Sequence, residues 1–360
     1  MRIGSLALDA PFFQAGLAGY SDAAMRLVAR RRGCTYAVTE AMLDQALLSD
    51  PRELASAEPD PCDHPLGGQL LGHSPEEMAA AARLMVDLGY DVVDVNLACP
   101  VKKVRGKSRG GHLLSAPDRA LAILSAVRQA VGGDTPCTVK LRRGTDDSRE
   151  AEANFRRILE GAISLGYAAA TVHARTVSQG YAGPSDGSFL AGLAATYGAV
   201  PGFSLLGSGD VREASDAVAM LRRTGVAGVS VARGAIGNPW IFYQARALLA
   251  GDETGARELP SLAKQREAIE EHFELALRVH GERRAALRMR KIGLAYARFH
   301  PCPEEVSRAF REISSSADWQ AVLDSHYCIE RQAKRPSTFG KRPPSTASEG
   351  APSQSSRTDA

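Results

Sequence analysis

The segment Asp-Val-Val-Asp-Val-Asn-Leu-Ala-Cys-Pro, residues 91–100, reads as a β-strand that ends in a turn. Its β-branched run predicts a strand over residues 91–97, and Gly89 before it is typical of a helix end. Cys99 follows the strand directly, and α/β barrels keep their chemistry at the carboxyl ends of their strands. A free cysteine is more often an inert core residue. Here Pro100 and the basic pair behind it favour an exposed loop instead.

Short apolar runs of the same kind recur along the chain, with helical patterns between them. The runs lie at residues 12–18, 36–42, 66–71, 91–98, 137–142, 168–175, 202–206 and 228–232. Ser74, Pro75 and Glu77 form a capping box that predicts a helix between the third and fourth runs. Eight such units predict an α/β fold of the (β/α)8 TIM-barrel type. A doubly wound open sheet is the alternative, but no Gly-x-Gly-x-x-Gly follows the first strand.

Beyond the barrel pattern the chain changes character twice. Strand signals stop near Leu262, and residues 268–280, 283–298 and 303–314 read as helices. Residues 331–360 are rich in Ser, Pro and basic residues and too polar for a core. We therefore expect a catalytic barrel at residues 1–245, a small C-terminal helical domain at residues 246–330, and a disordered basic tail at residues 331–360.

Composition narrows the protein class without settling the function. Hydrophobic residues make up 44% of the chain and charged residues 24%, which is ordinary for a soluble globular protein. The apolar runs are shorter than the ~20 residues of a membrane span, and the N-terminus lacks a signal pattern. We therefore expect a cytoplasmic protein that does not bind membranes. The six cysteines are scattered without metal-ligand spacing, so we expect reduced thiols and no metal.

A basic cluster is hidden by the net charge of only +3. Within residues 278–298, seven cations lie against a single acid, Glu282, on a predicted helix. Such a run is more often a solvated helix face. One-signed clustering beside a neutral barrel nevertheless favours a polyanionic partner. The candidates for that contact are Arg284, Arg288 and Lys291, which share one helical face.

Five segments, at residues 96–103, 139–144, 172–176, 179–184 and 233–240, follow one another in the order of the blocks of a known family. From about residue 11 to about residue 324 the chain resembles the bacterial tRNA-dihydrouridine synthases. These flavoenzymes reduce the C5–C6 double bond of uridines in tRNA. The resemblance implies FMN as cofactor, NADPH or NADH as reductant and tRNA as the macromolecular partner. We expect a monomer.

The flavin-binding residues are expected at the strand ends. Alternation points Lys140 into the barrel, where a lysine is unfavourable unless it meets an anion. The resemblance implies that this anion is the flavin, and an ion pair with a barrel carboxylate is the alternative. His173 has the same inward geometry, with an ordinary core histidine as its alternative. The other implied contacts are Gly16, Leu17, Ala18 and Gln69 for the ring, with Ser208, Gly209, Asp210, Ala232 and Arg233 for the phosphate.

The reaction needs a hydride from the flavin and a proton from the protein. A thiol that keeps its proton at neutral pH suits a general acid, and the resemblance gives Cys99 this role. Asn96 offers a donor and an acceptor to the uracil edge. The remaining substrate contacts implied are Lys102, Lys103, Arg105 and Arg175, together with the three cations of the basic helix. The target base must leave its stack to reach the flavin.

Two other functions compete with this one. A flavin-barrel dehydrogenase of a free small molecule would have no use for a basic helix. A non-catalytic RNA-binding barrel protein would have no need for Cys99, Lys140 and His173 together. The identity of the modified uridine and the choice between NADPH and NADH stay open.

Overall fold

A computed structural model describes the chain over residues 1–100 and 109–328. The strands are β1 (Arg2–Ile3), β2 (Leu6–Ala7), β3 (Phe12–Gln14), β4 (Ala37–Val38), β5 (Met42–Leu43), β6 (Leu66–Leu71), β7 (Val92–Leu97), β8 (Cys137–Arg142), β9 (Ala169–His173), β10 (Ser204–Ser208) and β11 (Gly228–Val231). The α-helices are α1 (Ala23–Arg30), α2 (Asp44–Ser49), α3 (Pro51–Ala57), α4 (Pro75–Asp87), α6 (Pro117–Val131), α7 (Arg149–Ser164), α8 (Gly187–Tyr197), α9 (Ala214–Thr224), α10 (Ile241–Leu249), α11 (Glu253–Arg257), α12 (Leu262–His280), α13 (Glu282–Tyr296), α14 (Pro303–Glu312) and α15 (Ser316–His326). Short 3-10 helices are η1 (Gly110–Ser115), η2 (Arg233–Ala235) and η3 (Ala297–Phe299).

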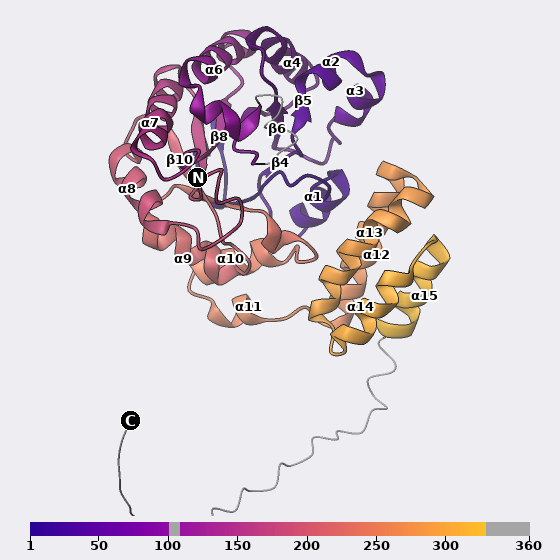
Figure 1. The fold of residues 1–360 in the computed structure, drawn as a ribbon. Helices are drawn as coiled ribbons and strands as arrows, with labels where there is room; N and C mark the ends of the chain where they lie inside the picture. Colours follow the sequence, from indigo (N-terminus) through magenta and orange to yellow (C-terminus); the bar gives the residue numbers. More distant parts are fainter. Residues whose placement is uncertain (101–108, 329–360) are drawn as a thin grey trace, which may run out of the picture.

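The parallel strands close into a barrel. Around the barrel the order is β3, β4, β6, β7, β8, β9, β10 and β11, and β11 pairs with β3 to complete the circle. Helices α4, α6, α7, α8 and α9 cover the outside (Figure 1). The predicted TIM barrel is therefore confirmed.

Alternating residues of the strands build two apolar layers. On β7, Val93, Val95 and Leu97 face the helices, while Val92 joins the inner cluster with Phe13. The same alternation turns Asp94 and Asn96 towards the barrel axis. The outer layer packs the helices against the barrel. The inward polar residues face the barrel axis, where they can take part in a site.

The second barrel strand differs from its prediction. Instead of one strand over 36–42, β4 and β5 are separate pieces that both pair with β6. Between them the Thr39 side-chain oxygen accepts a hydrogen bond from the Gln69 backbone N–H at 3.0 Å. A side-chain acceptor thus replaces a ladder carbonyl, and the strand is interrupted there.

The seventh barrel strand also differs, because β10 begins and ends two residues later than predicted. Gly202 has a φ of +76°, which belongs to a turn and keeps it out of the strand. Ser208, predicted in the loop, pairs with His173 and Ser230 as the last residue of β10. An N-terminal hairpin, β1 and β2, was also not predicted, and its Ile3 closes the bottom of the barrel.

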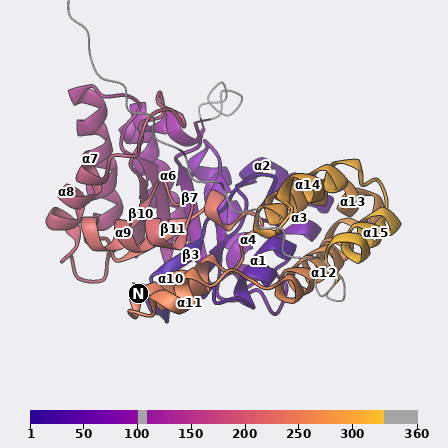
Figure 2. The same ribbon diagram turned by 90° about the horizontal axis from the view of Figure 1, so that it is seen from below.

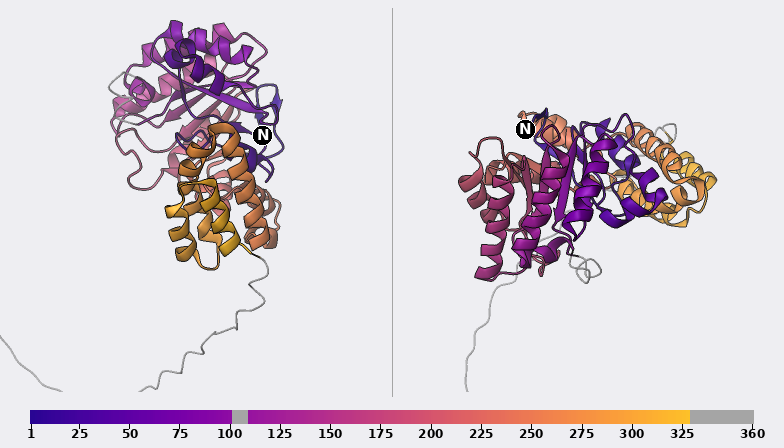
Figure 3. Two further views of the ribbon diagram at one scale, coloured as in Figure 1. Left: turned by 90° about the vertical axis from the view of Figure 1, so that its right-hand side faces the viewer. Right: turned by 90° about the horizontal axis from the view of Figure 1, so that it is seen from above.

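The C-terminal helices form a group of their own. Helices α12 to α15 pack around Phe310 and Trp319, and α12 lies against α1. Figures 2 and 3 show this group beside α1, on one side of the barrel. The sequence analysis missed α15, although Ser315 and Asp318 form a capping box at its start. In the described ranges, no helix is long and apolar enough to cross a membrane.

The domain limits remain predictions. A boundary after residue 245 would fall inside α10, which packs on α9. The predicted tail at residues 331–360 lies outside the described residues.

Candidate active site at the barrel mouth

The predicted site residues of the barrel gather at one face, the carboxyl ends of its parallel strands, which we call the mouth. His173 is the last residue of β9, Asn96 is the last but one of β7, and Lys140 lies two residues before the end of β8. The register places Asn96 beside Lys140 and Lys140 beside Thr171. Below Lys140 the barrel is nearly filled, since the remaining cavity of about 10 Å³ holds at most about one water. This cavity is therefore too small for a ligand larger than a water.

The turn that carries Cys99 is held by Asn96. The Asn96 Oδ1 atom accepts the backbone N–H groups of Ala98, at 2.9 Å, and Cys99, at 3.0 Å. Its Nδ2 donates to Gln69 Oε1 at 2.7 Å. One Nδ2 hydrogen is left for a ligand, so the main work of this side chain is to fix the turn. From the other side, Arg142 Nε donates to the Ala98 carbonyl at 3.0 Å.

A buried carboxyl group completes the network behind this turn. Asp94 accepts hydrogen bonds from Gln69 Nε2, at 2.7 Å, and from Thr138 Oγ1, at 2.6 Å. Burial raises the pKa of Asp94, although these two hydrogen bonds and the charge of Lys140 oppose the shift. Gln69 thus bridges Asp94 and Asn96, and all three residues are at least nine-tenths buried. The network makes the floor of the mouth rigid.

Lys140 points into the mouth without a hydrogen-bond partner for its ammonium group among the described residues. Burial, followed by the charge of Arg142, lowers the pKa of Lys140 to about 8, while Asp94 and Cys99 oppose the shift. The charge of Asp94 acts on Lys140, but no carboxylate oxygen of the described residues lies within ion-pair distance of its ammonium group. The ammonium group can therefore meet a ligand.

His173 is a neutral imidazole at the rim of the same floor. Burial, then the charges of Lys140, Arg142 and Arg175, lower the pKa of His173 to about 2. Its Nδ1 accepts the Arg175 backbone N–H at 3.2 Å, so its proton lies on Nε2. His173 can therefore donate a hydrogen bond from Nε2.

The predicted phosphate side of the mouth contains an arginine pair around Asp210. This carboxylate accepts from Arg175 Nη2 at 2.6 Å and lies 3.4 Å from Arg233 Nη2. Burial alone would raise the pKa of Asp210, but the two arginines and the Ser185 N–H hold it below its usual value. Arg175 Nη1 is buried and has no hydrogen-bond partner among the described residues. Ser208, Gly209 and Ala232 supply backbone beside the pair.

The loop after β3 brings Gly16, Leu17 and Ala18 to the mouth. A Cβ at Gly16 would lie 2.1 Å from the Thr39 carbonyl oxygen, so only glycine allows the loop to approach β4 this closely. The Leu17 N–H donates to Ser21 Oγ at 2.7 Å, which folds the loop back on itself.

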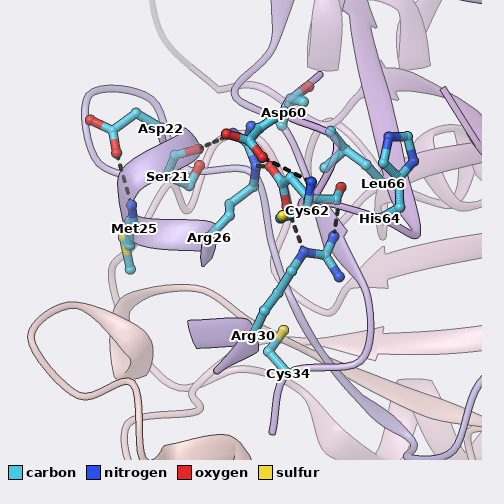
Figure 4. Close-up of polar contacts among 12 residues, drawn as sticks. Ser21, Asp22, Met25, Arg26, Arg30, Cys34, Asp60, Cys62, His64 and Leu66 are labelled. Carbon is cyan, nitrogen blue, oxygen red and sulfur yellow. Dashed lines mark hydrogen bonds and ion pairs between the residues drawn. The ribbon is translucent and has the colours of Figure 1, made fainter. Parts of the chain in front are cut away.

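Arg26 and Arg30 of α1 connect this loop to the segment before β6 (Figure 4). The fully buried Asp63 receives Arg26 Nε at 2.7 Å and Arg30 Nε at 2.6 Å. Arg26 Nη1 also donates to the Ser21 carbonyl at 2.7 Å. The ion pairs therefore tie the loop after β3 to the segment that precedes β6.

The three predicted cations of the basic helix are not equivalent. On α13, Lys291 Nζ donates to the Gly19 carbonyl and lies 3.9 Å from the centre of the Tyr20 ring. Arg288 lies 3.6 Å from Asp22 and 3.9 Å from Glu40. Both residues therefore join α13 to the barrel, whereas Arg284 is exposed. Their predicted contact with RNA stays a prediction.

Several site residues were missed by the sequence analysis. Asp94 and Thr138 could have been found from strand alternation, because both occupy inward positions beside predicted residues. Arg142 and the exposed Tyr181, whose ring Arg142 and Arg233 approach at 5.6 and 5.2 Å, depend on loop geometry. Lys102, Lys103 and Arg105 lie outside the described residues.

Comparison with known proteins adds independent information. The family model "Dihydrouridine synthase (Dus)" matches residues 13–334. A probable tRNA-dihydrouridine synthase of Treponema pallidum is 35% identical over 340 residues, 91% of this chain and 97% of that protein. One of Rhodobacter capsulatus is 34% identical over 83% of this chain and 87% of its own length. tRNA-dihydrouridine synthase B of Xanthomonas campestris is 33% identical, with 92% and 93% covered.

Solved structures agree on the fold. Histamine dehydrogenase from Rhizobium sp. 4-9 superposes with a TM-score of 0.54 at 15% identity. The match covers 76% of this chain, and this chain spans 50% of that one. The likeness confirms a barrel fold and by itself carries no further information about the reaction.

Proposed function

The chain belongs to the dihydrouridine synthase family, and we propose that it reduces the C5–C6 double bond of uridines in tRNA, with FMN as cofactor and NADPH or NADH as reductant. The observation that carries this proposal is the mouth itself. A free ammonium group, a neutral histidine and a fixed thiol-bearing turn converge there above a closed floor. A small anionic aromatic ligand and a flipped base both suit such a pocket.

The residues present suit a flavin in the mouth. The Lys140 ammonium group and Arg175 Nη1 have no hydrogen-bond partner among the described residues, so both can bind an acceptor on the ligand. Gln69 and the loop at Gly16 line the floor, and the turns at Ser208 and Ala232 offer backbone N–H groups beside Arg233. A reduced flavin bound there would supply the hydride.

Cys99 is proposed to give the proton to the uracil carbon opposite the hydride. Its side chain is half-buried at the mouth, and Asn96 and Arg142 fix its backbone from two sides. A general acid needs this positioning, because a small displacement of the donor lowers the rate steeply. The remaining Asn96 Nδ2 hydrogen and the His173 Nε2–H are donors for the uracil carbonyl oxygens.

The tRNA is proposed to reach the mouth across the side on which α13 lies. Arg284 is exposed there, and the cations Arg288 and Lys291 stand beside the loop after β3. Phosphate contacts of this kind position an RNA without reading its sequence.

The test is dihydrouridine formation on an unmodified tRNA transcript with FMN and NADPH, measured by nucleoside mass spectrometry. Cys99→Ala should keep flavin binding and lose about 10²- to 10⁴-fold in product formation. Cys302→Ala, a change of another half-buried cysteine, serves as the matched control. Wild-type product from Cys99→Ala would assign the proton to another group.

A further inference from the structure

Arg109 is a buried arginine that directly precedes the 3-10 helix η1. It is 4% exposed and is the first described residue after residues 101–108. Its Nη2 donates to Gln45 Oε1 at 2.8 Å, and its Nε donates to His73 Nδ1 at 3.4 Å. Asp44 Oδ1 lies 3.6 Å from the same Nη2. We call Arg109, Asp44, Gln45 and His73 the rim latch.

The partners of Arg109 come from two other barrel strands. Asp44 and Gln45 begin α2, directly after β5, and His73 follows β6. Asp44 is fully buried, and its Oδ1 accepts the Gln45 N–H at 2.8 Å. A buried guanidinium needs such a carboxylate, because an unpaired buried charge is strongly unfavourable. These contacts therefore fix the Arg109 guanidinium between the ends of the second and third barrel strands.

Gly110 and Gly111, which follow Arg109 in the chain, contact Cys99. The Gly111 N–H donates to the Cys99 carbonyl at 3.1 Å. Gly110 has a φ of +58°, and a Cβ there would lie 3.0 Å from the Cys99 Cβ. The backbone that follows Arg109 thus lies directly against Cys99, so the place of the guanidinium fixes the place of that backbone.

A metal site is the competing interpretation of the same cluster. Ligand atoms of Asp44, His73 and Glu77 all lie within 4.8 Å of one another. Arg109 already brings a positive charge to Asp44 and points its Nε at His73, and both Glu77 oxygens accept from Gln45 Nε2. Asp44 Oδ2 has no hydrogen-bond partner among the described residues, but a divalent cation there would meet the positive charge of Arg109 beside Asp44 and His73. The cluster is therefore better explained as the binding place of the Arg109 guanidinium.

We propose that the rim latch is a positioning unit that holds Cys99 through the backbone of Gly110 and Gly111, while Asn96 and Arg142 hold the Cys99 turn through other contacts. The proposal rests on the proposed function only for its effect on turnover. Its effect on the geometry of the Cys99 thiol is independent of that function. The four latch residues act on Cys99 through the backbone of Gly110 and Gly111.

The experiment compares Arg109→Gln and Asp44→Asn with wild type in two measurements. The first is the rate at which iodoacetamide alkylates Cys99, mapped by peptide mass spectrometry, with the exposed Cys62 as internal reference. The second is the rate at which tRNA reoxidises the reduced flavin of the holoenzyme. We expect faster alkylation of Cys99, unchanged alkylation of Cys62, and flavin reoxidation slower by about 10- to 100-fold. Reduction of the flavin by NADPH should keep its rate.

Two further variants sharpen the result. Arg109→Lys keeps the charge and should restore part of both rates. Arg119→Gln is the matched control, because the exposed Arg119 donates only to the backbone carbonyl of His73, at 3.1 Å, among the described residues, and it should behave as wild type. Wild-type alkylation and reoxidation rates in Arg109→Gln would overturn the latch. Wild-type turnover of Cys99→Ala would refute the acid role of Cys99 instead, and alkylation alone would then decide the latch.

Discussion

Lys140 in the barrel mouth and Lys291 on α13 are both half-buried lysines, yet their ammonium groups have opposite surroundings. Burial lowers the pKa of each, further reduced by Arg142 at the first and by Arg288 at the second. Lys291 donates to the Gly19 carbonyl and lies over the Tyr20 ring. For Lys140, none of the described residues offers a hydrogen-bond acceptor.

The difference separates a ligand contact from a structural contact. A buried cation that donates to an acceptor of its own chain connects two segments, as Lys291 connects α13 to the loop after β3. A buried cation without a hydrogen-bond acceptor is unfavourable until a ligand that provides one is bound. Both lysines were predicted from the sequence as ligand contacts, and the fold separates the two roles.

The largest contrast should appear in flavin affinity. Lys140→Met removes the unsatisfied ammonium group and should weaken FMN binding by about 10- to 100-fold, the value of a charge-assisted hydrogen bond. Lys291→Met should weaken binding much less, because its ammonium group already donates to the Gly19 carbonyl. Fluorescence titration of the apoprotein with FMN measures both. Equal losses of FMN affinity in the two variants would contradict the distinction between a ligand contact and a structural contact.

Protein stability should show the reverse pattern. Lys291→Met breaks a hydrogen bond from a charged group and a cation–π contact, so the free energy of unfolding should fall by about 1–2 kcal/mol. Lys140→Met in the flavin-free protein should be neutral or stabilising, since it removes a buried unpaired charge. Urea denaturation of the two apoproteins is the measurement. A loss of stability in Lys140→Met but not in Lys291→Met would mean that Lys140 is the structural contact.

The pH dependence of flavin binding follows from the Lys140 pKa of about 8. A ligand that prefers the charged lysine raises this pKa, so FMN affinity should decrease as the pH rises above 8, by at most about tenfold per pH unit. Lys140→Met should bind FMN with little pH dependence in this range. For stability the sign is opposite: the unfolded lysine, with its pKa of 10.5, holds more protons between pH 8 and 10.5. In that window this group makes the flavin-free protein more stable as the pH increases.

The smallest effect is expected in the salt dependence of tRNA binding. Each phosphate contact contributes about −0.7 to −0.9 to the slope of log affinity against log salt. Changing Arg284, Arg288 and Lys291 together to Gln should flatten this slope, with Arg284→Gln alone giving most of the change, because the other two cations pair with the barrel. Filter binding at several salt concentrations measures it. An unchanged slope would leave α13 as a purely structural helix.

Strand alternation explains why the barrel and part of its floor could be predicted from sequence. Lys140 and His173 stand at inward positions of apolar strands, and the structure brings them together at the mouth. The partners of Lys291 and Arg109 could not be predicted, since Gly19 lies 272 residues from Lys291 and Gln45 lies 64 residues from Arg109. Such contacts depend on how loops fold over the barrel rim, which no local pattern records. Helix α15 was a different kind of miss, because its capping box was readable in the sequence.

One measurement tests the central claim most directly, namely that the mouth joins a flavin to a uridine and that Cys99 completes the transfer. The flavin of the holoenzyme is reduced by NADPH without oxygen, excess NADPH is removed, and an unmodified tRNA transcript is added. Flavin absorbance and dihydrouridine content are then followed in the same sample. The account predicts one dihydrouridine for each flavin reoxidised, with both processes slowed together in Cys99→Ala. A flavin that stays reduced with tRNA, or reoxidises without forming dihydrouridine, would contradict it.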